Sequence, residues 1–200
     1  ISLEQDPLFE AMKAALAGNI IDFSALPEVS PVLVKETLFK TLRMQSLDYS
    51  LYTRLVKELG SAKNLLYLGD NAGEIVMDKL FLRELKQRFS HVSITFATRA
   101  KPISSDITEA DAYQVGIDGL ATVINNGTDL PGTDLLEVSE PFLEVFHNAD
   151  IIISKGQGNF ETLTGSGKNI YYLFLCKCDV FTAMLKVGKL TPVFLAERQR

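Results

Sequence analysis

The sequence predicts a three-layer α/β/α fold with a mainly parallel, doubly wound sheet, preceded by a helical segment. Short apolar runs typical of buried strands alternate along the chain with segments whose apolar residues recur at helical spacing. Three helical patterns come before the first of these strands. Strands that alternate with helices favour right-handed βαβ units and a sheet covered on both faces.

Residues 1–60 are expected to form a helical lead-in segment. Asp6 as N-cap and Pro7 at the first helical position predict a helix that ends at Gly18. A second Ser-Pro signal at residues 30–31 predicts another helix to about Met44. The third helix is expected at 48–59, before Gly60.

Residues 61–200 are expected to form an α/β domain that carries the functional site. Its strands are expected at 64–69, 91–97, 121–124, 150–154 and 170–176. Its helices are expected at 75–89, 108–115 and 141–147. We expect this domain and the lead-in to form one compact unit. The sequence begins with Ile1 and not Met, which is compatible with a longer protein whose N-terminal part precedes it.

Composition excludes several classes of partner. The net charge is −5 and the pI is near 5.1, which argues against a nucleic-acid surface. The longest apolar stretches, such as residues 171–176, are too short to span a bilayer, and no signal-peptide pattern opens the chain. Cys176 and Cys178 lack the spacing of a zinc site, and as reduced thiols they fit a cytoplasmic protein.

The segment Asp70-Asn71-Ala-Gly-Glu74 is the strongest indication of a site. It directly follows the first predicted strand, and open α/β sheets bind ligands at the carboxyl ends of their strands. A helix restarts near Ile75, so free N–H groups of this turn can face an anion. Oxygen ligands beside an anion cradle predict a hard cation that holds a phosphate.

Polar residues also follow the other strands. Asp106 follows the second strand, and the fourth is followed by Lys155 and the segment Gly156-Gln-Gly158-Asn159. A lysine beside a Gly-x-Gly can meet a phosphate with a point charge and close backbone N–H groups. A carboxylate about 4 Å from a phosphate charge costs on the order of 4 kcal/mol at a dielectric of 20, so this acidic edge implies a divalent metal.

Local structural explanations stay open for these residues. Asp106 begins a D-x-x-E pattern that fits a helix capping box. Asp70 and Asn71 can be turn formers. Gly165-Ser-Gly-Lys168 imitates the end of a phosphate-binding P-loop, but Thr162 and Asn169 stand where that loop needs glycine and Ser or Thr.

Three ordered motifs together resemble the metal-dependent damage-control phosphatase family, also called domain-of-unknown-function 89, in its archaeal or bacterial branch. They are Gly69-Asp-Asn-Ala-Gly-Glu-Ile75, Lys101-Pro-Ile-Ser-Ser-Asp106 and Ser154-Lys-Gly-Gln-Gly-Asn-Phe-Glu161. The resemblance extends to Gly18-Asn-Ile-Ile-Asp-Phe23 and the loop at 127–133.

This resemblance implies an α/β/α fold and a divalent metal held by Asp70, Asn71 and Asp106. It places Lys155 and the loop Gly156–Asn159 near a substrate phosphate, and the expected catalytic residues are Asp70, Glu74 and Lys155. The metal is expected to be Mn²⁺, Mg²⁺, Co²⁺ or Ni²⁺, since oxygen ligands do not discriminate sharply among them.

The expected activity is metal-dependent hydrolysis of small phosphomonoesters, such as sugar phosphates or damaged phosphometabolites. The expected partner is therefore a small phosphorylated metabolite, and no oligomeric state follows from the sequence. Whether water or Asp70 is the nucleophile stays open, although the ligand role is favoured for Asp70. Two alternatives are a carboxyl methyltransferase that uses S-adenosylmethionine and a non-catalytic, metal-dependent sugar-phosphate-binding protein.

Overall fold

The computed structural model describes residues 6–20, 30–43 and 47–198, in which one sheet has the strand order β3-β2-β1-β4-β5-β6. The strands are β1 (Asn64–Leu68), β2 (Ser93–Thr98), β3 (Thr122–Asn125), β4 (Ile151–Lys155), β5 (Ile170–Cys176) and β6 (Thr191–Ala196). The first five are parallel, and β6 is antiparallel to β5. The strand order changes direction between β1 and β4, which is the switch point where doubly wound sheets bind ligands.

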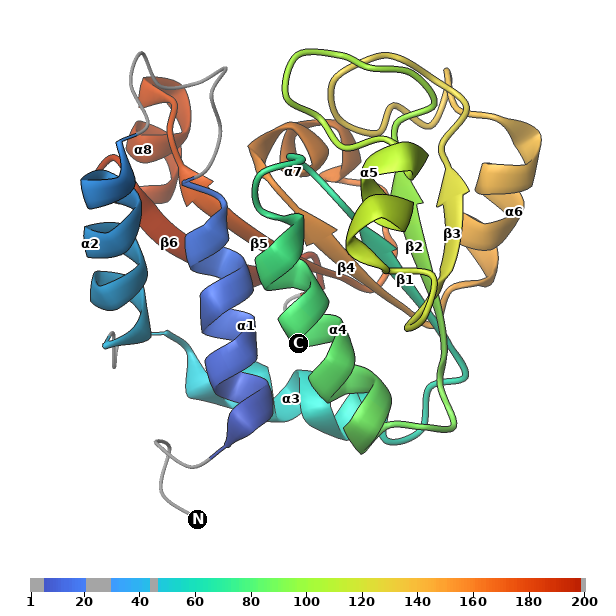
Figure 1. Cartoon of the computed structure of the whole chain (residues 1–200), viewed down its shortest axis with the longest axis horizontal. Helices are drawn as coiled ribbons and strands as arrows, with labels where there is room; N and C mark the ends of the chain where they lie inside the picture. The colour runs from blue at the N-terminus through green and yellow to red at the C-terminus, as the bar shows by residue number, and fades with distance from the viewer. Residues whose placement is uncertain (1–5, 21–29, 44–46, 199–200) are drawn as a thin grey trace.

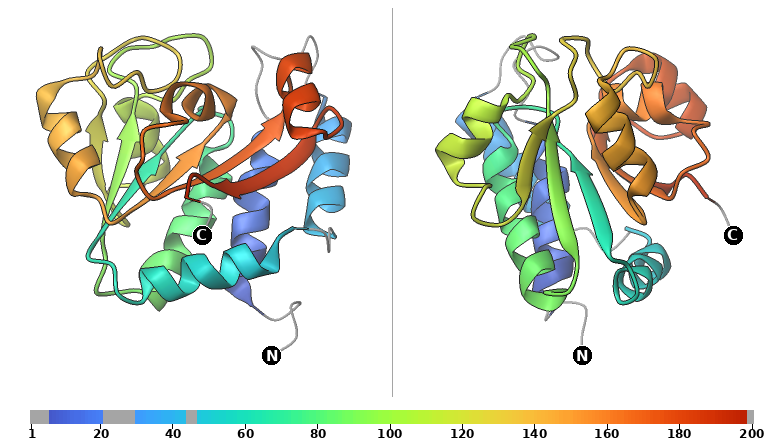
Figure 2. Two further views of the ribbon diagram at one scale, coloured as in Figure 1. Left: turned by 180° about the vertical axis from the view of Figure 1, so that it is seen from behind. Right: turned by 90° about the vertical axis from the view of Figure 1, so that its right-hand side faces the viewer.

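Helices cover both faces of this sheet, as the sequence predicts (Figures 1 and 2). They are α1 (Pro7–Gly18), α2 (Pro31–Leu42), α3 (Tyr49–Leu59), α4 (Ile75–Arg88), α5 (Glu109–Val115), α6 (Glu140–Asn148), α7 (Gln157–Leu163) and α8 (Asp179–Leu185). The edge-on view in Figure 2 shows α1, α4 and α5 on one face and α6 and α7 on the other. The expected end of α2 near Met44 lies outside the described residues.

Alternation along the strands explains the two layers of the core. In β1, Leu65 and Tyr67 contribute to the apolar cluster shared with α1, α3 and α4, whereas Leu66 and Leu68 contribute to the cluster shared with α6 and α7. Successive side chains of a strand point to opposite faces, so a parallel strand covered on both sides is apolar throughout. The first of these clusters includes residues on both sides of position 60, so the helical lead-in and the α/β domain share one core.

Helix α1 packs along α4, which brings its carboxyl end to the switch-point edge of the sheet (Figure 1). The approach is close at Gly18, where a Cβ atom would lie 3.1 Å from Cβ of Met77. No helix within the described ranges is long and apolar enough to cross a membrane.

Three elements differ from the expectation. Helices α7 and α8 and strand β6 are present where no element was expected. The helix cap also lies elsewhere: Thr108 and Asp111 form the capping box of α5, so the D-x-x-E prediction for Asp106 was wrong. The side chain of Asp106 instead accepts a hydrogen bond from Arg99, one of the interactions of the candidate site.

Candidate functional site at the switch point

Three of the predicted site residues come together beyond the carboxyl end of β1. Asp70 and Asn71 follow this strand after Gly69, and an isolated antiparallel bridge joins Asn71 to Asp106. The carbonyl oxygen of Asp70 accepts a hydrogen bond from the backbone N–H of Ile107 at 2.8 Å. These bonds hold the loop after β2 against the loop after β1, so two carboxylates and one amide share this edge.

Gly156 lies beside Asp70 at the end of β4. Its φ of +80° is in the region that favours glycine, and a Cβ atom there would approach the carboxyl carbon of Asp70 to 2.0 Å. Its backbone N–H donates to the carbonyl of Leu173 at 3.1 Å. The neighbouring strand thus leaves space for the Asp70 carboxylate only because residue 156 has no side chain.

A buried ionic cluster lies next to Asp70 and joins β1, α4 and β4. Nζ of Lys155 lies 2.5 Å from Oε2 of Glu74 and 2.5 Å from Oδ1 of Asp78. The hydroxyl of Tyr67 donates to the same Asp78 oxygen at 2.6 Å. None of the three charged side chains is more than 1% exposed, so the lysine compensates two carboxylates away from water.

The charges of this cluster are coupled. Burial alone would lower the pKa of Lys155, but Asp78 and Glu74 raise it above its usual range and keep the ammonium charged. Burial opposes ionisation of Glu74 as well, but Lys155 lowers the pKa of this carboxyl overall. At Asp78 burial dominates and raises the pKa to about 6. The direct phosphate contact predicted for Lys155 stays a prediction, and the structure gives its ammonium two carboxylate partners.

Arg99 connects two of the predicted site residues, Asp106 and Asn159. Its Nε donates to Oδ2 of Asp106 at 2.7 Å, and its Nη2 donates to Oδ1 of Asn159 at 3.2 Å. The Asn159 side chain also accepts from Thr133 at 2.7 Å and donates to the carbonyls of Lys155 and Gly69. Both donors and the acceptor of this amide are used within the protein, so the phosphate contact predicted for Asn159 likewise stays a prediction.

Several residues of the site were missed from the sequence, namely Asn19, Tyr67, Asp78, Arg99 and Thr133. Asn19 is the carboxyl-terminal cap of α1, and its amide donates to both Asp70 and Glu74. Two signals were available in the sequence: Asn19 lies in the segment 18–23 of the resemblance, and Arg99 directly follows the second strand, where a charge that becomes buried needs a partner.

The electrostatics around Asp70 fit a bound cation. Burial, followed by the charges of Glu74 and Asp106, raises the pKa of Asp70 to about 8, although Lys177 and Arg99 act in the opposite direction. Within the described part of the chain, no three His, Cys, Asp or Glu side chains are arranged to hold a metal. The predicted ligand set is of a different kind from such a group, because it combines the carboxylates of Asp70 and Asp106 with the amide of Asn71. Its oxygen donors and its excess of negative charge suit a hard divalent ion.

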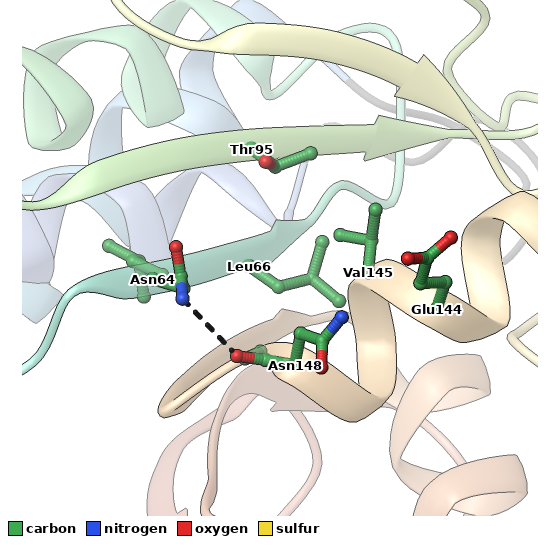
Figure 3. Close-up of a pocket in the computed structure, with 8 residues that line it drawn as sticks. Asn64, Leu66, Thr95, Glu144, Val145 and Asn148 are labelled. Atoms are coloured by element: carbon green, nitrogen blue, oxygen red, sulfur yellow. Dashed lines mark hydrogen bonds between the residues drawn. The ribbon is translucent and has the colours of Figure 1, made fainter.

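A separate cavity of about 420 Å³ lies between α6 and the sheet (Figure 3). Glu144, Val145 and Asn148 of α6 face Leu66 and Thr95 there. The cavity reaches the start of β1 and contains none of the predicted site residues.

An oxygen-rich, acidic site at the switch point is typical of α/β domains that bind a cation together with a phosphorylated ligand. The comparisons with known proteins name a family of phosphatases. The chain belongs to the family described as the damage-control phosphatase ARMT1-like domain, whose model matches residues 1–192.

Archaeal proteins are the most informative relatives. A damage-control phosphatase of Pyrococcus horikoshii is 37% identical over 180 residues, which are 90% of this chain and 61% of the relative. A damage-control phosphatase of Archaeoglobus fulgidus is 34% identical over 179 residues, covering 87% of this chain and 60% of that protein. The chain thus spans about three fifths of the length of these two relatives.

A solved structure shares the fold. The crystal structure of a DUF89 family protein from P. horikoshii matches with a TM-score of 0.83 at 36% identity, covering 94% of this chain and 65% of that one. The predicted resemblance to domain-of-unknown-function 89 and the predicted three-layer fold are therefore confirmed.

Proposed function

We propose that this chain carries the active site of a metal-dependent phosphatase that hydrolyses small phosphomonoesters. The observation that carries the proposal is the convergence of Asp70, Asn71 and Asp106 at the switch point. Relatives named damage-control phosphatase, at 34% and 37% identity, support phosphate-ester hydrolysis over methyl transfer or ligand binding without turnover.

Asp70, Asn71 and Asp106 are the proposed ligands of Mn²⁺, Mg²⁺, Co²⁺ or Ni²⁺. Such an ion supplies Lewis acidity toward a phosphoryl oxygen and a bound water of lowered pKa. We assign Asp70 the role of ligand, since its carboxylate is repelled by Glu74 and Asp106 until a cation is present. Arg99 holds one oxygen of Asp106 at 2.7 Å, which fixes the orientation of this carboxylate.

In this proposal Glu74 and Lys155 do not bind the metal and instead support the residues that do. Oε1 of Glu74 accepts from the backbone N–H of Asn71 at 3.0 Å, and Oε2 is paired with Lys155. Both side chains are fully buried, so they orient the ligand loop and balance its charge. The phosphate is expected at Gly158, whose backbone N–H is in the first turn of α7 and has no partner within that helix.

Phosphate release from p-nitrophenyl phosphate tests the proposal. The chain should release phosphate with at least one of the four metals and lose this activity in chelator. Asp106→Asn should remove most of the activity. Asp129→Asn is the matched control, because Asp129 is exposed and its Nζ–O contact with Lys101 is 3.8 Å long. Absence of release with every metal, or full activity in Asp106→Asn, would contradict the proposal.

A further inference from the structure

Asn19 contacts the proposed ligand set from a distant part of the sequence. Its side chain lies at the carboxyl end of α1 and is 0% exposed. Its Nδ2 donates to Oδ2 of Asp70 at 3.0 Å and to Oε1 of Glu74 at 2.9 Å. Its Oδ1 accepts from the backbone N–H of Leu175 at 3.0 Å. One amide therefore connects α1, the loop after β1 and the carboxyl-terminal part of β5.

These bonds select one oxygen of Asp70. Oδ2 accepts from Asn19 and also from Nδ2 of Asn71 at 2.7 Å. Within the described ranges, both of these side-chain hydrogen bonds go to Oδ2. The carboxylate is thus held through this oxygen.

Asn19 is itself firmly placed. Its side-chain oxygen Oδ1 is held by the backbone N–H of Leu175 in β5. Gly18, the residue before it, permits the close packing of α1 on α4. An amide anchored in this way can orient Asp70 before any metal binds. A carboxylate that is already oriented loses less conformational freedom when it coordinates an ion.

We propose that Asn19 is a positioning residue for the metal site: it orients Asp70 and separates the charges of Asp70 and Glu74. This inference rests on the proposed function, since it concerns the same site. Loss of a residue that orients a metal ligand typically lowers metal affinity about 10- to 100-fold. The same weakening is expected when the Asn19 amide is removed.

The test is a calorimetric titration of the metal-free chain with Mn²⁺ alone. Asn19→Leu removes both donors at similar side-chain volume and should raise the Kd for Mn²⁺ about 10- to 100-fold. The matched control is Asn169→Leu, because Asn169 also donates to a carboxylate (Glu58, 2.8 Å) and a backbone carbonyl (Asp150, 3.3 Å). Asn169 precedes β5 at the opposite end of the sheet. The Kd of Asn169→Leu for Mn²⁺ should therefore equal that of the wild type.

The outcomes separate this inference from the proposed function. If Asn19→Leu fails to fold, Asn19→Ser, which retains a single hydroxyl donor, replaces it and should still bind Mn²⁺ more weakly than the wild type. Wild-type affinity in the folded Asn19 variant, or an equal loss in Asn169→Leu, overturns the positioning role and leaves the phosphatase proposal standing. A wild-type chain without saturable Mn²⁺ binding overturns both.

Discussion

The carboxylate of Asp70 lies against Gly156, where a Cβ atom would approach its carboxyl carbon to 2.0 Å. Asp70 follows β1 and Gly156 follows β4. These are the neighbouring strands between which the order of the sheet reverses. Their contact shows how the sheet forms the site: one strand supplies the carboxylate and the other supplies backbone without a side chain. A substitution at residue 156 therefore tests the site without altering any proposed ligand.

Gly156→Ala should abolish Mn²⁺ binding by displacing Asp70. Gly165→Ala is the control, because Gly165 also has a positive φ, of +90°, but nothing lies within 4 Å of its Cβ position. Both variants carry backbone strain of about 1–3 kcal/mol because φ is positive at both positions, and only the first carries the clash. Calorimetric titration with Mn²⁺ distinguishes them. Equal affinities in the two variants would mean that the contact with Asp70 has no role in binding.

Asp70→Asn should stabilise the metal-free chain while removing its response to metal. The neutral amide relieves repulsion from Glu74 and Asp106, and relief of such strain at a functional site typically gains about 0.5–2 kcal/mol. The wild type should gain about 2.7 kcal/mol when Mn²⁺ is present at a hundredfold excess over its Kd. Thermal unfolding with and without Mn²⁺ measures both effects, with Asp118→Asn on the exposed surface as control. A lower Tm in metal-free Asp70→Asn would argue against the repulsion.

Lys155→Met should destabilise the fold by about 3–5 kcal/mol, since Glu74 and Asp78 would remain buried without their counter-ion. Lys101→Met should cost less than about 1 kcal/mol, because Lys101 and its partner Asp129 are exposed. Urea denaturation at neutral pH gives both values. A Lys155→Met variant as stable as the wild type would contradict the structural role of this ammonium.

Asp6 should make stability depend on pH in the acid range. Burial acts to raise its pKa, but hydrogen bonds from Tyr52 and Arg88 outweigh burial and lower the pKa below the usual 3.8. The unfolded chain thus binds the proton more readily, so this contribution is complete above about pH 4 and is lost as pH falls through the lowered folded-state pKa. Asp6→Asn keeps an N-cap residue and should lower the free energy of unfolding by about 1 kcal/mol at pH 7.

The difference between wild type and Asp6→Asn should shrink as the pH falls below about 4. Urea denaturation at a series of pH values measures it. A difference that stays constant down to pH 2 would show that the carboxylate charge is not what stabilises this contact.

Local signals explain why much of the fold could be predicted. The Asp6–Pro7 start of α1 is a short-range pattern, and the Asp6 side chain does accept from the backbone N–H of Leu8. Strand β6 was missed because Pro192 argues against a strand, yet β6 is an edge strand, where proline is tolerated. Helix α7 was missed because it is short and contains Gly158; burial of its apolar residues offsets that poor propensity.

Only those site residues that follow the ends of predicted strands could be predicted from the sequence. Asp70 and Asp106 each follow a strand, and the parallel sheet brings them to one edge. The contacts of Asn19 with Asp70 and of Lys155 with Asp78 join residues 51 and 77 positions apart. Such pairs depend on how α1 and α4 pack, which residue spacing along the chain does not encode.

Anomalous diffraction from crystals soaked in Mn²⁺ tests the central claim most directly, because it locates the ion without reference to activity. The proposed site predicts a peak within coordination distance of Asp70, Asn71 and Asp106, and no peak there in crystals of Asp70→Asn. A Mn²⁺ peak elsewhere in the molecule with this edge of the sheet empty, or an unchanged peak in the variant, would contradict the account.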